Sequence, residues 1–177
     1  MTATDAPDVA SDAAAPETLA MLDRRRIEAE ILGHVYATLK ETAGPEAAAQ
    51  TVGEAVRRSA LQQARRFAAA AGGQTSLQTF IDRGSLWEKG GALETVVLRR
   101  TGTEYDFNVT RCRYAEMYRE MGLGEIGHLL SCNRDATFCE GYDAKLKLTR
   151  TQTIMGGASH CDFRYRYVEE GVGSAPR

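Results

Sequence analysis

The stretch ALETVVLRRTGTEYDFNVT, residues 92–110, decides the fold class of this chain. Its first part, residues 92–101, is rich in β-branched side chains and predicts a buried strand. Residues 104–110 alternate strictly, which places Tyr105, Phe107 and Val109 on one face and polar side chains on the other. The connector GTE is short enough for a β-hairpin, so we expect an antiparallel pair of strands here.

Before this hairpin the chain has the spacing of helices. In residues 24–44, apolar side chains recur every four positions and predict a helix that buries this stripe. The stripe consists of Ile27, Ile31, Val35 and Leu39, and Leu32 and Tyr36 widen it. A long Ala-rich helix is expected over residues 45–73, because alanine has the highest helix propensity. A shorter helix over residues 76–84 has Ser76 as its expected N-cap.

After the hairpin the pattern returns to helix and then to strand. Residues 111–132, with a break near Gly122 and Gly124, and the short segment 136–142 have helical spacing. Residues 144–155 and 161–168 predict a second hairpin, which turns at the paired glycines 156–157. The order of elements predicts an α+β fold in which N-terminal helices pack on an antiparallel sheet of about four strands, in two hairpins separated by helices.

Length and composition agree with one globular domain. The chain has 177 residues, of which 43% are apolar and 26% are charged. We expect a single domain over residues 17–170, with disordered tails at residues 1–16 and 171–177.

Charge and hydropathy exclude two classes of partner. The net charge of −2 argues against nucleic acid, and no apolar run is long enough for a transmembrane helix, so no membrane is expected. The N-terminus lacks the basic start and apolar middle of a secretory signal. We therefore expect a cytoplasmic protein with reduced cysteines, a small-molecule substrate, and an Ala-rich helix that is compatible with a homo-oligomer.

The first candidate for chemistry is Cys112, where a strand leads into a helix. A helix N-terminus lowers the pKa of a thiol, and Glu116 lies one turn further along the same helix face. The alternation also places Asn108 and Thr110 on one polar strand face, which Cys112 directly follows. The alternative is that Cys112 is a small buried hydrophobic residue, which is the commonest environment of a free cysteine.

The second candidate is Cys132, at the end of a predicted helix. Glu125, His128 and Cys132 are spaced to share one helical stripe, and Asp135 follows three residues later. A carboxylate near a thiol can move protons for it. The alternative places Glu125 and His128 in solvent and makes Asp135 the cap of the next helix.

The other two cysteines have the features of packing residues. Cys139 lies within a short helix, and Cys161 shares a strand face with aromatic side chains. The gaps between successive cysteines are 20, 7 and 22 residues, without the close pair of a structural zinc site. His160 and Cys161 point to opposite strand faces, so neither a metal nor another cofactor is predicted, although a zinc site assembled in three dimensions stays an alternative.

Three local motifs resemble the L-2-amino-thiazoline-4-carboxylic acid hydrolase family. They are TRCRYAE at residues 110–116, SCNRD at residues 131–135, and LTRTQTIMGGASHCDF at residues 148–163. Their order and spacing hold over residues 105–165. The resemblance implies a hydrolase that opens a small nitrogen-containing ring, in the type reaction by adding water to the ring carbon between nitrogen and sulfur.

The resemblance also implies roles for particular residues. Cys132 would be the nucleophile and Asp135 its proton partner, while Cys112 and Glu116 match the strand-to-helix motif. Which of the two thiols reacts stays open. The residues implied for substrate binding, with Arg111 holding a substrate carboxylate, are Asn108, Arg111, His128 and His160.

A second resemblance, at the level of the fold, is to small-molecule sensor domains of the 4-vinyl reductase type. The closing pattern of strand, glycine turn and C-x-F is similar to theirs. Arg150 and Thr153 stand where those domains have acidic and thiol ligands for zinc, so the resemblance does not extend to the metal. It implies a pocket between helices and sheet, and it makes a non-catalytic small-molecule-binding domain the alternative function.

Overall fold

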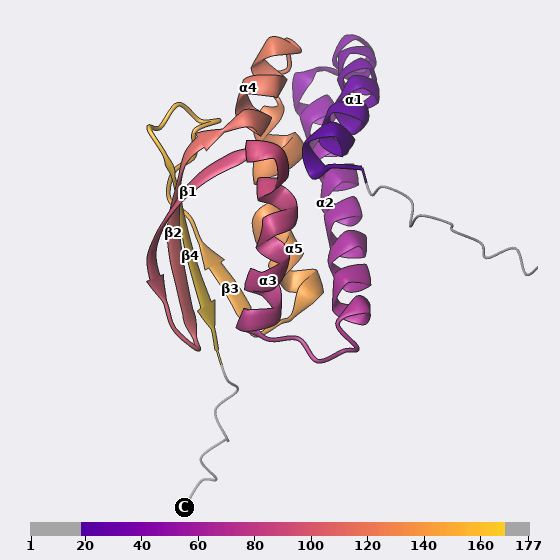
Figure 1. The fold of residues 1–177 in the computed structure, drawn as a ribbon. Helices are drawn as coiled ribbons and strands as arrows, with labels where there is room; N and C mark the ends of the chain where they lie inside the picture. The colour runs from indigo at the N-terminus through magenta and orange to yellow at the C-terminus, as the bar shows by residue number, and fades with distance from the viewer. Residues whose placement is uncertain (1–18, 169–177) are drawn as a thin grey trace, which may run out of the picture.

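The computed structural model describes residues 19–168, which form helices packed on one face of a four-stranded sheet (Figure 1). The α+β class is confirmed. The tails expected at residues 1–16 and 171–177 lie outside the described part of the chain. The α-helices are α1 (Met21–Ala43), α2 (Pro45–Ala70), α3 (Leu77–Glu88), α4 (Arg113–Glu120) and α5 (Arg134–Tyr142). The short helical turns are η1 (Lys89–Gly91) and η2 (His128–Cys132).

The sheet is antiparallel throughout, with strand order β1-β2-β4-β3. Its strands are β1 (Leu93–Arg100), β2 (Glu104–Cys112), β3 (Leu146–Thr149) and β4 (Cys161–Tyr167). The two predicted hairpins therefore meet along β2 and β4. In Figure 1, α3 and α5 lie between the sheet and the outer pair α1 and α2. No helix within residues 19–168 has the length and apolar character needed to cross a membrane.

The helices form where the sequence predicts them, but α1 buries only part of its predicted stripe. Ser76 is the N-cap of α3, and its hydroxyl accepts a hydrogen bond from the Thr79 backbone N–H. Ile27 and Ile31, predicted to be buried, are 55% and 66% exposed. Tyr36, at the edge of the predicted stripe, is buried, and the buried side also carries Arg25, because this side faces α2 and the interior of the site. A four-residue period identifies a helix without showing which side its neighbours cover.

Two strand predictions also need correction. β1 is an edge strand with Val96, Val97 and Leu98 exposed, rather than a buried strand. β3 ends at Thr149, before the predicted end of the strand at residue 155. Its pairing stops because the Asp162 carboxylate accepts the backbone N–H groups of residues 151 and 152, which turns the chain into a loop.

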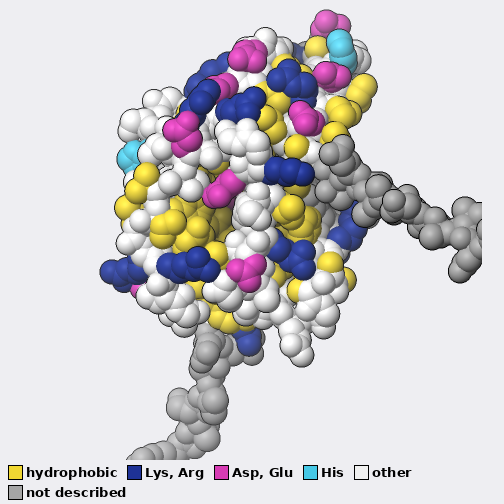
Figure 2. Space-filling model, in the orientation of Figure 1, with side chains coloured by type: hydrophobic (Ala, Val, Ile, Leu, Met, Phe, Trp, Pro, Cys, Tyr) yellow, Lys and Arg dark blue, Asp and Glu magenta, His cyan; other side chains and the backbone are white. Residues whose placement is uncertain are grey.

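The inner face of the sheet is aromatic. Phe107 of β2 stacks on Phe163 of β4, with ring centroids 4.9 Å apart, and Tyr165 continues the layer. Phe80 of α3 and Phe138 of α5 cover these rings from the helical side. Figure 2 shows hydrophobic side chains lining a hollow between α3 and the sheet. The aromatic layer is one wall of the site.

Candidate active site

Two adjoining cavities lie between the sheet and the helices. The thiol cavity has a volume of about 70 Å³, and the aromatic cavity has a volume of about 110 Å³. The thiol cavity is lined mainly by Cys112, Tyr114, Cys132, Arg150, Met155 and Cys161. The aromatic cavity is lined mainly by Phe80, Trp87, Tyr105, Phe107, Phe138 and Tyr165. Three charged residues line both cavities, namely Arg25, Arg134 and Asp135.

A β-bulge turns Cys112 toward the thiol cavity. In the β1–β2 ladder Glu94 pairs with Arg111 and Thr95 with Val109, so Thr110 has no partner. The extra residue changes the alternation, and Cys112 lies on the same face as Val109 rather than on that of Asn108. Simple alternation along the strand does not reveal this direction, because it ignores the bulge.

A π-helical turn, η2, separates Cys132 from its predicted stripe. The Asn133 N–H donates to the His128 carbonyl across five residues, at 3.0 Å. Cys132 lines the thiol cavity, whereas His128 is exposed and Glu125 pairs with Lys40 at the surface. The predicted stripe of Glu125, His128 and Cys132 thus does not exist, because the wider turn rotates Cys132 away from the other two residues.

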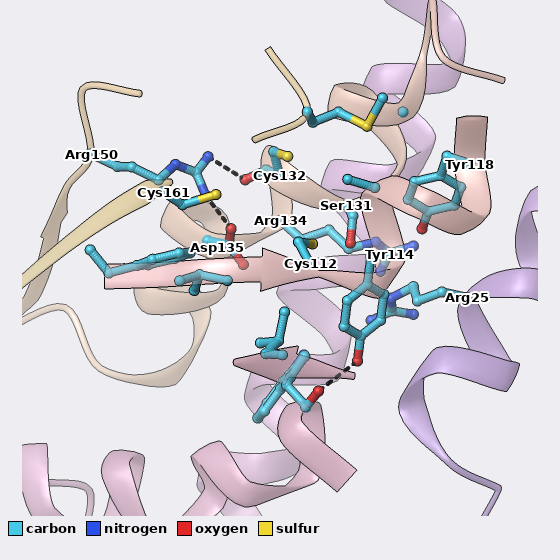
Figure 3. Close-up of a pocket in the computed structure, with 17 residues that line it drawn as sticks. Arg25, Cys112, Tyr114, Tyr118, Ser131, Cys132, Arg134, Asp135, Arg150 and Cys161 are labelled. Atoms are coloured by element: carbon cyan, nitrogen blue, oxygen red, sulfur yellow. Dashed lines mark hydrogen bonds and ion pairs between the residues drawn. The ribbon is translucent and has the colours of Figure 1, made fainter. Parts of the chain in front are cut away.

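Asp135 and Arg150 form an ion pair at the border of the two cavities (Figure 3). Arg150 also donates to the Cys132 carbonyl at 2.9 Å and lies over the Phe163 ring, 5.1 Å from its centroid. α5 begins one residue before Asp135, with Asn133 as its N-cap, so the carboxyl is not the helix cap considered from sequence. Burial raises the pKa of the Asp135 carboxyl above its ordinary value, although Arg150 acts in the opposite direction.

The thiols of the cavity are held in the neutral form. Burial raises the pKa of Cys112 to about 11, even though the N–H groups of the following helix act to lower it. Burial, and then the neighbouring Asp135, raise the pKa of Cys132 to about 12. The helix N-terminus at Cys112 therefore does not produce the thiolate that the sequence suggested, because the cost of burying a charge is larger.

Cys161 and Cys139 have different environments. Cys161 is buried, as expected, but its sulfur lines the thiol cavity and accepts the Ile154 N–H at 3.2 Å. Cys139 is buried among the residues that pack α5 on the sheet and lines neither cavity. Three of the four thiols thus surround one space. Within residues 19–168, no group of three or more His, Cys, Asp or Glu side chains is arranged to hold a metal ion.

Several residues suggested by the sequence lie away from the cavities. Arg111 and Glu116 pair with each other on the surface, where they are 53% and 39% exposed. Asn108 is on the outer face of the sheet and accepts a hydrogen bond from Arg164 at 2.9 Å. His160 packs against Gln152 in the loop that follows β3. The structure brings Cys112, Cys132 and Asp135 together but leaves these residues, and His128, outside the site.

Sequence reasoning missed the two buried arginines. Arg25 stands in a run of three arginines, and no local pattern distinguishes the buried one from its exposed neighbours. Arg134 is part of the SCNRD motif, so its position next to Asp135 was the available signal. Burial lowers the pKa of Arg134 to about 10, and repulsion by Arg25 acts in the same direction.

A comparison with known families identifies the family of this chain. The family model for L-2-amino-thiazoline-4-carboxylic acid hydrolase matches residues 24–165, which include every charged and thiol residue of the two cavities. The chain belongs to this family. Among curated proteins, none matches the chain.

Two solved structures are similar to this chain. One is the phenol-responsive sensory domain of the transcription activator PoxR with phenol, at 14% identity and a TM-score of 0.50, covering 77% of this chain and 73% of that one. The other is a trafficking protein particle complex subunit 3 from Naegleria fowleri covalently bound to palmitic acid, at 11% identity and a TM-score of 0.49, covering 84% and 99%. The PoxR domain supports the likeness in fold between this hydrolase family and small-molecule sensor domains.

Proposed function

We propose that this protein hydrolyses a bond in a small nitrogen-containing ring, such as a cyclic amidine, an amide or a thiazoline. Membership of the hydrolase family gives the reaction class. The observation that carries the finer proposal is the Asp135–Arg150 pair at the border of a cavity lined by Cys112, Cys132 and Cys161. It provides an acid–base group and thiols around one cavity.

Asp135 is suited to the transfer of protons. A carboxyl with a raised pKa holds and releases a proton nearer to neutral pH than a surface carboxyl does. Arg150 fixes the position of the Asp135 carboxyl. Because Arg150 also donates to the Cys132 carbonyl, it holds this carboxyl near the segment that carries the Cys132 thiol. Fixed geometry of this kind speeds a reaction, because the reacting groups are already positioned within one complex.

Cys132 acts as the nucleophile in this proposal. The ring nitrogen is protonated first, which makes the neighbouring carbon electrophilic. The Cys132 thiol adds to that carbon, and its proton passes to Asp135. The bond from the carbon to the ring heteroatom then breaks, and the departing atom takes the proton from Asp135.

Water completes the cycle. It adds to the same carbon and gives a proton to Asp135, which returns it to Cys132 as the C–S bond to the enzyme breaks. The proton first taken up by the ring nitrogen leaves as the new carbonyl forms. The net change is one water added across one ring bond.

The size of the site agrees with a small ring. Cavities of about 70 and 110 Å³ match a small molecule better than a peptide or an oligosaccharide. The PoxR sensory domain, of similar fold, was solved with phenol, which is a small ring. The same likeness is the basis of the alternative, a binding domain without turnover.

The test is incubation of the purified protein with L-2-amino-thiazoline-4-carboxylate, followed by mass spectrometry. With the native protein we expect a product heavier than the substrate by one water. With Cys132→Ala we expect no product. Cys139→Ala is the matched control, because this thiol lines neither cavity, and it should keep turnover. Thermal stabilisation by cyclic compounds without any product would favour the binding domain instead. Full activity of Cys132→Ala would show that Cys132 is not the nucleophile. The same measurement would then be made on Cys112→Ala.

A further inference from the structure

Two arginine side chains are buried beside the catalytic residues proposed above. Arg25 is 3% exposed and Arg134 is 7% exposed, and both line the two cavities. Their guanidinium groups approach the same oxygen, Oε2 of Glu28, at 2.7 and 3.0 Å. Figure 3 shows both groups on the side of the thiol cavity near Tyr114. The two cations come from segments more than 100 residues apart, so tertiary folding assembles this pair.

The pair has more positive charge than its neighbours balance. Glu28 is the one carboxylate within salt-bridge distance of either Arg25 or Arg134 among residues 19–168. It also accepts a hydrogen bond from the exposed Arg24 at 3.0 Å. Of the carboxylates that line the cavities, Asp135 pairs with Arg150, and Glu88 accepts a hydrogen bond from Thr95. Burying a cation without a matching anion is costly, so an excess of positive charge at a cavity wall indicates a place for an anion.

One guanidinium nitrogen has no partner. Arg134 donates from Nε to the Leu130 carbonyl at 2.8 Å and from Nη2 to Glu28, but its buried Nη1 makes no hydrogen bond with the described part of the chain. Buried polar groups without partners are rare in native proteins, and a ligand is a common explanation. An oxygen of a bound anion would satisfy this donor.

We propose that Arg25 and Arg134 bind the carboxylate of the substrate, and that the aromatic cavity takes an apolar or aromatic substituent of the same molecule. Guanidinium groups match the planar, two-oxygen geometry of a carboxylate better than that of any neutral group. Arg134 precedes Asp135 directly in α5, so the anchored carboxylate lies close to the proton-transfer group. That the bound molecule is a substrate rests on the proposed function. The binding of an anion by Arg25 and Arg134 can be tested without turnover.

The aromatic cavity limits the rest of the molecule. Phe80, Phe138 and Tyr165 offer ring faces and edges rather than hydrogen bonds, which suits an apolar group. A volume of about 110 Å³ is enough for one small ring. The substrate class is therefore a compact cyclic acid, with room for one apolar substituent.

The first experiment compares acids with amides of the same shape on the native protein. Phenylacetate and benzoate carry a carboxylate and an aromatic ring, and phenylacetamide and benzamide replace only the carboxylate. We expect at least one of the acids to bind about 10- to 100-fold more tightly than its amide in calorimetric titration, the range for charge-assisted hydrogen bonds. Equal binding of acid and amide, or no binding of any of the four probes, would overturn the proposal, whether or not the protein hydrolyses rings.

The second experiment uses matched arginine variants. Arg134→Gln should reduce the preference for acid over amide to about one, and Arg134→Lys should keep part of it because the charge remains. Arg24→Gln is the control, because Arg24 contacts the same Glu28 but lies at the surface and lines neither cavity. Each variant is first checked for a cooperative thermal transition, and if Arg134→Gln does not fold, Arg134→Lys decides. An unchanged acid preference in the folded Arg134 variant, or its equal loss in Arg24→Gln, would contradict the assignment.

Discussion

Arg150 and Asp135 form an ion pair that connects the loop after β3 with the first turn of α5. The same guanidinium donates to the Cys132 carbonyl, so three segments of the site meet on one side chain. Its charge also opposes the effect of burial on the Asp135 carboxyl. Arg150 therefore has both a structural and an electrostatic role, and the two can be separated by experiment.

Substitution of Arg150 by glutamine should raise the pKa of Asp135 further, because the nearby positive charge lowers it. If Asp135 must be ionised to accept a proton, the acidic limb of the kcat/KM profile moves to higher pH, by about one unit or more. We also expect kcat/KM at neutral pH to fall by about 10²-fold. The measurement is a pH profile of ring opening for both proteins.

Arg119→Gln is the control for this prediction. Arg119 donates to the Ile154 carbonyl and so holds the same loop, but it does not touch Asp135. Its loss should leave the pH profile in place. A profile that shifts equally in both variants would show that loop position, rather than charge, governs the Asp135 carboxyl.

Two carboxylates from the sequence motifs can be compared directly. Asp135→Asn should lower kcat by about 10²- to 10⁴-fold, the usual contribution of an acid–base group. Glu116→Gln should change kcat by less than about threefold, because Glu116 pairs with Arg111 at the surface and lines neither cavity. Steady-state kinetics on folded variants tests both, and a large loss in Glu116→Gln would place the reaction outside the cavities described.

The α+β architecture could be predicted from sequence because its signals are local. Alternation identified β2, and the serine at position 76 identified the start of α3. The site could be predicted only in part. Cys132 and Asp135 were found through their motif, but the direction of Cys112 depends on a bulge at Thr110 that sequence alternation cannot reveal.

The charged residues of the site were the hardest to predict. Arg25 is buried because of what packs around α1, and its exposed neighbours Arg24 and Arg26 have the same chemistry. Likewise, Ile27 and Ile31 have the right spacing for a core and are exposed. Which face of a helix is covered is a property of the whole fold, so it is absent from any short window of sequence.

The cavity thiols should react slowly with alkylating agents in the absence of substrate. At pH 8 a thiol whose pKa is raised to about 11 or 12 has roughly 10²- to 10³-fold less thiolate than an ordinary cysteine. The thiolate fraction, and with it the rate, should rise steadily as the pH is raised toward those values. Labelling with iodoacetamide and peptide mass spectrometry would measure Cys112 and Cys132 separately.

Protein unfolded in guanidinium chloride is the reference for this labelling, since all four thiols then react as free cysteines. Rapid modification of Cys132 in the folded protein at pH 8 would mean that its thiolate is already stabilised. In that case Cys132 would not need to transfer its proton to Asp135 during attack.

A last prediction concerns the contact that places Asp135. Gly141 of α5 packs against α2, and a Cβ at this position would lie 2.8 Å from the Ala64 Cβ and 2.9 Å from the Leu61 carbonyl oxygen. Neither atom belongs to a flexible side-chain end, so Gly141→Ala must push the two helices apart. We expect the free energy of unfolding to fall by about 1–3 kcal/mol. Because α5 also carries Arg134 and Asp135, kcat should fall with it.

Gly84→Ala is the matched substitution for this test. Gly84 is also helical, in α3, but a Cβ there meets no atom within 4 Å. Alanine should therefore stabilise the protein by about 0.5–1 kcal/mol through its higher helix propensity. Urea unfolding of both variants gives the comparison. If Gly141→Ala were as stable as Gly84→Ala, α2 and α5 would not be in close contact, and the position of Asp135 would depend on Arg150 and the sheet instead.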